Sequence, residues 1–186
     1  MADSQWWNAP RRGVTLGCLS VVLVAVPTFA CCCGAMGLLL EARAQAGPGS
    51  AAATDSVRAF MRTVAHDVTR DGPTAWLKFF DDSPAFFMAV NGAMAFPDPS
   101  AARNGTQKFA DTNRSVELKW GDDLRVDPLA PGLAVVGATW HEVQVDKSGR
   151  RTAEGGYFTA VLERKQGRWR FRDAHWSSPV DATVAQ

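Results

Sequence analysis

The 186-residue chain has room for one domain and an additional segment, and its charge is close to balanced, with 20 Lys and Arg against 19 Asp and Glu. Without residues 1–46, which contain three arginines and two acidic residues, 17 charges of each sign remain. This balance argues against a nucleic-acid partner, because proteins that bind nucleic acids engage the phosphates with a basic surface. All four cysteines precede residue 34, so the rest of the chain is not a disulfide scaffold.

An uncharged, mostly apolar stretch runs from Gly13 to Leu40. As a helix, residues 14–40 would rise about 40 Å, which exceeds the roughly 30 Å hydrocarbon core of a bilayer. Arg11 and Arg12 precede the stretch and no basic cluster follows it. The positive-inside rule then predicts a cytoplasmic N-terminus and a domain outside the membrane, either periplasmic or extracellular. We expect a cytoplasmic tail over residues 1–13, a single transmembrane helix over 14–40 and a flexible linker over 41–53.

Three cleaved forms remain open as alternatives. Ala42-Arg43-Ala44 matches a signal-peptidase site, although the apolar stretch is longer than the usual region of about 7–15 residues. Cleavage before Cys31 would give a lipid-anchored protein, and Arg11-Arg12 is part of a twin-arginine signal. A cleaved chain would be secreted or lipid-anchored instead of being held by a spanning helix.

Helical patterns open the part of the chain that follows, over residues 54–180. Apolar residues from Val57 to Val68 recur at spacings of three and four, which predicts an amphipathic helix capped by Thr54 or Ser56. Gly72 ends that helix, and Pro73 begins a second, shorter one. A third short helix is expected over residues 100–112, and residues 181–186 form a C-terminal tail.

Strand patterns fill most of the remaining chain. Asn91-Gly92 separates two apolar runs within residues 85–96, which is typical of a β-hairpin. Further strands are predicted over 116–126, 133–145, 157–164 and 169–177, joined by connections too short for parallel crossovers. The sequence therefore predicts an α+β domain in which about three helices pack on a curved antiparallel sheet.

The last strand alternates with a period of two. This alternation predicts one face formed by Trp169, Phe171, Asp173, His175 and Ser177, and an opposite face formed by Arg170, Arg172, Ala174 and Trp176. We expect the first face to begin in the core and to end at the rim of a pocket.

The order of elements and the run Gly167-Arg168-Trp169-Arg170-Phe171, leading to His175-x-Ser177, resemble the nuclear transport factor 2-like superfamily. The resemblance covers residues 55–179 and is nearest to the SnoaL-like and association-domain branches. It implies a cone-shaped fold with a pocket at its open end. It does not imply one activity, because isomerases, dehydratases, cyclases and non-catalytic dimerisation modules share this fold.

Three side chains are candidates for acid–base chemistry: His175, Asp173 and Asp67. The expected pocket lining is Trp76, Phe80, Phe86, Phe109, Trp120, His141, Tyr157, Trp169 and Phe171. No metal or cofactor is expected, because His66, His141 and His175 are not spaced as ligands and no phosphate-binding glycine loop is present.

The leading hypothesis is a membrane-tethered, non-catalytic domain that binds a small apolar ligand or another protein. The alternative is an isomerase-, dehydratase- or cyclase-type enzyme that uses His175 with Asp173 or Asp67. A homodimer is expected through the convex sheet face, with Trp140, Arg170, Arg172 and Trp176 at the interface. A third possibility is a scaffold domain whose only role is this dimerisation.

Overall fold

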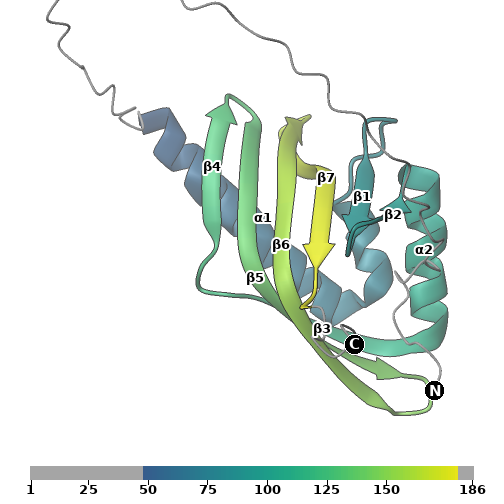
Figure 1. Ribbon diagram of the computed structural model, residues 1–186. Helices are drawn as coiled ribbons and strands as arrows, with labels where there is room; N and C mark the ends of the chain where they lie inside the picture. Colours follow the sequence, from purple (N-terminus) through teal and green to yellow (C-terminus); the bar gives the residue numbers. More distant parts are fainter. Residues whose placement is uncertain (1–47, 180–186) are drawn as a thin grey trace, which may run out of the picture. The chain divides into compact units, whose positions relative to one another are not determined.

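The computed structural model describes residues 48–179, which adopt a cone-like α+β fold (Figure 1). Its helices are α1 (Pro48–Asp71), the 3-10 helix η1 (Pro73–Lys78) and α2 (Pro99–Thr112). Its strands are β1 (Phe87–Val90), β2 (Ala93–Phe96), β3 (Asn113–Trp120), β4 (Arg125–Ala130), β5 (Leu133–Asp146), β6 (Arg151–Lys165) and β7 (Arg168–Ser177). The predicted α+β class with about three helices is confirmed, and the elements follow in the predicted order, except that the strand predicted over 116–126 is two strands, β3 and β4.

The strands form one sheet in the order β2-β1-β7-β6-β5-β3, and β4 pairs with the first half of β5. Neighbouring strands are antiparallel except β1 and β7, which run parallel with Met88 beside Ala174. The prediction of a purely antiparallel sheet is therefore wrong. Short connections determine how consecutive strands pair, but β1 and β7 are far apart in the chain, so no short connection constrained their direction.

Helix α1 covers one face of the sheet and lies behind β4 to β7 in Figure 1. The predicted stripe is its buried side, and Val57, Met61, Val64 and Val68 are fully buried. We call the sheet face that packs on α1 the inner face and the opposite one the outer face. Burial of a Val or Met side chain contributes about 1.5–3 kcal/mol, so this stripe holds the helix on the sheet.

The beginning of α1 differs from the prediction. The helix starts at Pro48, so the last part of the predicted linker is helical, and Ser56 lies within the helix instead of capping it. The hydroxyl of Ser56 accepts a hydrogen bond of 2.9 Å from the Trp169 indole. A second indole, that of Trp120, donates to the Met61 carbonyl at 2.9 Å. Two tryptophans of the sheet therefore fix the position of α1 through polar contacts as well as packing.

The hairpin and α2 match the predicted pattern. Asn91 and Gly92 both have positive φ, as a two-residue hairpin turn requires. Helix α2 begins where Asp98 accepts a hydrogen bond from the Ala101 amide at 2.8 Å. Gly105 in the middle of α2 has a packing reason, because a Cβ atom at this position would lie 2.2 Å from the Phe96 ring. The glycine allows the hairpin to approach the helix closely.

The predicted transmembrane segment, residues 14–40, lies outside the described residues. None of the helices in the described part of the chain combines the length and the apolar character that crossing a bilayer requires.

Candidate functional site

A cluster of aromatic rings fills the interior at the end of β7. Trp176 is at its centre, with ring centroids 5.0 Å from Trp140, 4.5 Å from Phe158, 5.7 Å from Trp120 and 5.6 Å from Trp76. Trp76, Trp140 and Phe158 are buried, and Trp120 and Trp176 pack against the core. These rings occupy the part of the inner face at which we expected the pocket.

The expected pocket residues do not share one surface. Trp76, Phe80, Phe86, Phe109, Trp169 and Phe171 belong to the buried core, with Trp120 packed against it. His141 and Tyr157 are exposed and lie on the outer face, because their strand neighbours Trp140 and Phe158 point inward. Placing His141 and Tyr157 in the same pocket as the other seven is therefore wrong.

A β-bulge at Arg172 explains why the expected face of β7 is not continuous. Val161 pairs with Asp173 and the next residue of β6 pairs with Phe171, so Arg172 is an extra residue in β7. Trp169 and Phe171 are buried before the bulge, whereas Ala174 is buried after it and His175 is exposed. The prediction that Asp173 and His175 share a face with Trp169 and Phe171 is wrong.

The same bulge turns Trp176 away from the expected dimer surface, and Trp140 on β5 faces inward as well. Trp140 and Trp176 lie in the interior, and only the two arginines of that set remain accessible. Arg170 donates a hydrogen bond to the Lys78 carbonyl, next to the edge at which Phe80 pairs with Phe171. The four predicted residues therefore do not form one convex surface.

Asp173 and His175 line an open depression of about 230 Å³ on the outer face. The other residues around it are Phe87, Ala89, Val135, Thr159, Ala160, Val161 and Ala174. Partial burial raises the pKa of Asp173, although its carboxylate accepts a hydrogen bond from the Val161 amide at 3.3 Å. Within residues 48–179, no hydrogen bond joins Asp173 to His175. The depression combines an apolar floor with one acidic and one basic group.

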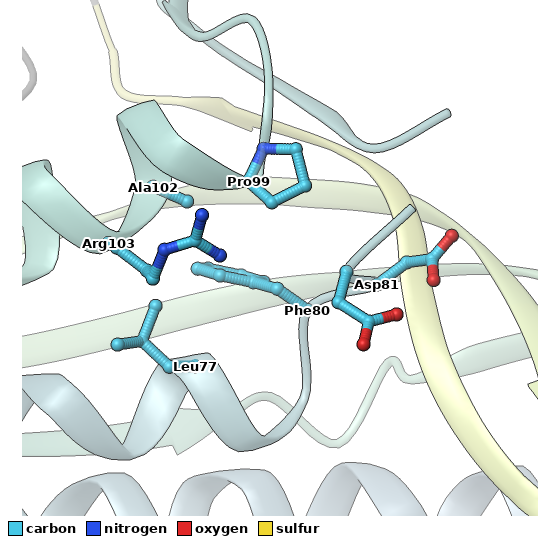
Figure 2. Close-up of a pocket in the computed structure, with 7 residues that line it drawn as sticks. Leu77, Phe80, Asp81, Pro99, Ala102 and Arg103 are labelled. Atoms are coloured by element: carbon cyan, nitrogen blue, oxygen red, sulfur yellow. The ribbon is translucent and has the colours of Figure 1, made fainter. Parts of the chain in front are cut away.

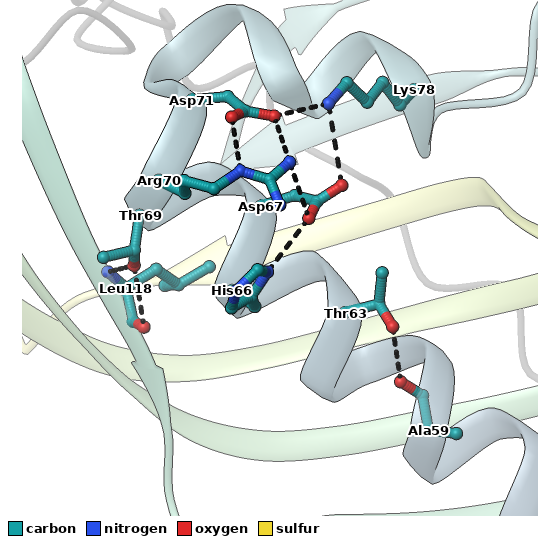
Figure 3. A network of polar contacts seen from close by, with 9 residues as sticks. All are labelled: Ala59, Thr63, His66, Asp67, Thr69, Arg70, Asp71, Lys78 and Leu118. Carbon is teal, nitrogen blue, oxygen red and sulfur yellow. Dashed lines mark hydrogen bonds and ion pairs between the residues drawn. The ribbon is translucent and has the colours of Figure 1, made fainter.

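Asp67, the third acid–base candidate, belongs to a network of charged side chains at the end of α1 (Figure 3). It contacts His66 at 3.1 Å, Arg70 at 3.3 Å and Lys78 at 3.6 Å. Asp71 extends the network by ion pairs of 2.6 Å with both Arg70 and Lys78. The hydrogen bond from His66, together with the two cations, lowers the pKa of Asp67. Asp67 therefore stays ionised, and its ion pair with Lys78 connects α1 to η1. Asp173 lies on the other side of the sheet.

A second, smaller pocket of about 90 Å³ lies between η1 and α2 (Figure 2). It is lined by Leu77, Phe80, Asp81, Asp82, Pro99, Ala102 and Arg103. The Asp81 carboxylate is 1 % exposed and is held by Lys165 Nζ at 2.7 Å and the Ser83 hydroxyl at 2.6 Å. Pockets for drug-sized ligands measure about 300–1,000 Å³, so both this pocket and the outer depression are too small to enclose such a ligand.

The strand patterns did not predict that Glu142 and Gln144 are buried. Both side chains lie on the inner face of β5. Gln144 Nε2 donates to Glu142 Oε1 at 2.7 Å. Burial, with the like charge of Glu154 as a smaller contribution, raises the pKa of Glu142 to about 7 against the lowering effect of this hydrogen bond. Alternation with Trp140 is the signal that could have found both residues, but Trp140 was assigned to the convex face.

Among residues 48–179, no cluster of three or more His, Cys, Asp or Glu side chains could hold a metal ion.

No protein-family model matches the sequence, and no curated protein matches it. Solved structures, in contrast, match most of the domain.

Three of these structures illustrate the range of similar proteins. A nuclear transport factor 2-like superfamily protein from Salmonella enterica is 17% identical, with a TM-score of 0.57, over 74% of this chain and 96% of its own. A putative scytalone dehydratase from Novosphingobium aromaticivorans is 11% identical, with a TM-score of 0.60, over 68% and 84%. A putative calcium/calmodulin-dependent protein kinase II association domain from Xanthomonas campestris is 16% identical, with a TM-score of 0.56, over 68% and 87%.

Proposed function

Since residues 48–179 have the nuclear transport factor 2-like fold, we propose that they form a non-catalytic interaction domain that pairs with a second copy through its outer sheet face. Solved proteins with this fold include one described as a dehydratase and one described as an association domain, so the fold alone does not decide between catalysis and association. The choice depends on the side chains of this chain.

The aromatic cluster around Trp176 is the observation that carries this proposal. Its rings occupy the inner face, at which an enclosed substrate pocket would need space. Asp67 lies on the opposite side of the sheet from Asp173 and His175, and it is already engaged by Arg70 and Lys78. This separation argues against an enzyme that uses Asp67 with His175. Asp173 and His175 share the open outer depression, but no hydrogen bond joins them in the described residues, and we therefore favour an interaction domain over an isomerase-, dehydratase- or cyclase-type enzyme.

The outer depression supports a second copy of the chain as the partner. Phe87 and Tyr157 on this face are 41% and 42% exposed, which provides aromatic area for an interface core. Arg172, which is exposed at the bulge, interacts electrostatically with the Asp173 carboxylate, so charges of both signs are present beside the depression. A surface of this kind can pair with itself about a two-fold axis, in which each residue meets its complement on the other copy.

The membrane tether is part of the same proposal. Residues 14–40 would span the bilayer and hold two neighbouring domains on its outer side. Tethering raises the effective concentration of each domain for the other, so an interface of modest affinity would suffice. N-terminal sequencing of the mature protein tests the tether, and a mature chain that begins near Gln45 would exclude it.

Disulfide trapping in membranes tests the pairing, because residues 48–179 contain no native cysteine. In a full-length chain whose four cysteines are changed to serine, Thr159→Cys places a single thiol in the outer depression. We expect mild oxidation to give a disulfide-linked dimer, and Val161→Glu in the same chain to abolish it. Met94→Cys, which is 54% exposed on β2, is the matched control and should remain monomeric. Equal cross-linking at both positions would contradict the proposed interface.

A further inference from the structure

Two turns lie side by side at one end of the sheet. The turn between β4 and β5 has Gly132 at positive φ, and the turn between β6 and β7 has Gly167 at positive φ. The turns touch, because the Arg164 amide donates to the Gly132 carbonyl at 2.8 Å. Figure 1 shows both turns at the end of the sheet from which α1 starts. We call residues 129–133 and 163–168 the paired turns.

The first of the paired turns exposes apolar side chains. Leu129 is 60% exposed, the highest value among the exposed large apolar residues of the described chain. Ala130 and Pro131 continue the exposed run, and residues 129–133 carry no charge. A single exposed leucine is ordinary on a protein surface, so the charge of the neighbouring turn decides what this apolar tip can contact.

The second of the paired turns places positive charge beside this tip. Arg164 and Arg168 are exposed, and neither forms an ion pair within residues 48–179. Glu163 is the one carboxylate of this turn, and Lys165 Nζ contacts it at 3.5 Å. The turn therefore presents two guanidinium groups without a carboxylate partner, and guanidinium groups bind phosphates well.

The path of the chain holds this end of the domain near the proposed tether. Helix α1 starts at Pro48, and the hydrogen bond from Trp169 to Ser56 fixes its first half beside the start of β7. Residues 41–47 separate Pro48 from the apolar stretch over residues 14–40, and a segment of that length spans at most about 25 Å. Strand β5 alone extends over about 46 Å. The tether therefore keeps the paired turns close to the bilayer, while the opposite end of the sheet can extend away from it.

We propose that the paired turns form a contact surface for a bilayer that contains anionic phospholipids. Leu129 and Pro131 enter the headgroup region, and Arg164 and Arg168 bind lipid phosphates there. The proposal rests on the membrane tether, because a domain released from the membrane would lose the proximity that this contact needs. It leaves the outer depression available for pairing with a second copy, since that depression is lined by other residues.

Fluorescence quenching by brominated lipids tests the contact in a full-length chain whose four cysteines are changed to serine. Ala130→Cys carries a bimane fluorophore beside Leu129, and Lys147→Cys carries it in the exposed loop between β5 and β6. In vesicles of brominated phosphatidylcholine and phosphatidylglycerol, the emission from position 130 should fall by roughly half or more, and that from position 147 should not change. Leu129→Glu should abolish the quenching at position 130. Met94→Glu, which is 54% exposed on β2, is the matched control and should leave it unchanged.

Lipid composition tests the role of the arginines. Vesicles without phosphatidylglycerol should give little quenching at position 130. Arg168→Gln should weaken the contact by roughly fivefold, so that more phosphatidylglycerol is needed for the same quenching. Arg150→Gln, an exposed arginine in the loop between β5 and β6, is the control and should behave as the parent chain does.

The results that would overturn the proposal separate it from the tether. Protein that alkaline carbonate removes from the vesicles has no spanning segment, which refutes the tether and this contact with it. Protein that stays in the membrane but shows equal quenching at positions 130 and 147 refutes the contact alone, and so does quenching that is independent of anionic lipid. Near-ultraviolet circular dichroism of the tryptophans shows whether Leu129→Glu is folded. The comparison of the two labelled positions does not depend on that variant.

Discussion

Trp176 and Trp140 pack edge to face, with their ring centroids 5.0 Å apart and their planes at 85°. The two residues come from different strands, β7 and β5, and β6 lies between these strands in the sheet. Their contact therefore bridges three strands on the inner face. Edge-to-face pairs of this kind add about 0.5–1.5 kcal/mol to the effect of burial alone.

We predict that Trp176→Ala lowers the free energy of unfolding by about 3–5 kcal/mol, because it leaves a cavity among the surrounding rings. Trp176→Phe should cost less, since part of the aromatic packing is kept. His175→Ala, the preceding and exposed residue of the same strand, is the control and should change stability by less than about 0.5 kcal/mol. Urea unfolding followed by tryptophan fluorescence measures all three.

Gly105→Ala should destabilise the domain by about 1–3 kcal/mol, although alanine is the better helix former. The reason is the new methyl group, which would lie 2.2 Å from Cε1 of Phe96. Phe96→Leu makes room for this group, so the two substitutions should cost less together than the sum of the single costs. A double-mutant cycle by thermal unfolding measures this coupling, and strict additivity would refute the proposed clash.

We expect Asp81 to make the free energy of unfolding depend on pH in the acid range. Burial favours the neutral form, but the hydrogen bonds from Lys165 and Ser83 outweigh it and lower the pKa below its ordinary value of 3.8. A lowered pKa stabilises the fold above pH 3.8, and this contribution disappears as the pH falls through the folded-state pKa. Asp81→Asn should cost about 1–3 kcal/mol at pH 7 and flatten the acid limb of the stability curve. Asp82→Asn, an exposed neighbour, should leave that limb unchanged.

Glu142 should act in the opposite direction. Its pKa is raised from 4.5 to about 7, so the folded state holds a proton that the unfolded state releases between these values. Stability therefore falls as the pH rises from 4.5 to 7, and the full cost remains above pH 7. At about 1.4 kcal/mol per pKa unit, Glu142→Gln should stabilise the domain by up to about 3 kcal/mol at pH 8 and have little effect at pH 4. Equal effects at both pH values would show that the Glu142 carboxylate is not held in a buried environment.

The elements were predictable because each has a local cause. The stripe from Val57 to Val68 defines the buried side of α1, and the Asn91-Gly92 turn defines the hairpin. It was harder to predict which side chains of a strand point toward the core. In β5, the two alternating sets of side chains are of similar polarity. Core packing distinguishes them, as in the contact of Trp140 with Trp176, and that contact joins residues distant in sequence.

The candidate site was harder to predict than the fold for the same reason. Asp173 and His175 were correctly recognised as neighbours on one face, but that face is the outer one. Glu142 and Gln144 were not among the predicted site residues, although both are buried. A polar residue in an alternating strand gives no local signal of burial, because its desolvation depends on what the rest of the fold packs against it.

The extra residue at Arg172 has a consequence for comparing this sequence with others. A homologue with the same number of residues here but without the bulge would carry the same Trp-x-Phe and His-x-Ser letters, but its histidine would point toward α1 and its final tryptophan toward solvent. An alignment without a gap there would equate an interior histidine with a surface one. Homologues should therefore be sorted by whether this strand contains the bulge between the Phe171 and His175 positions before any role is transferred along it.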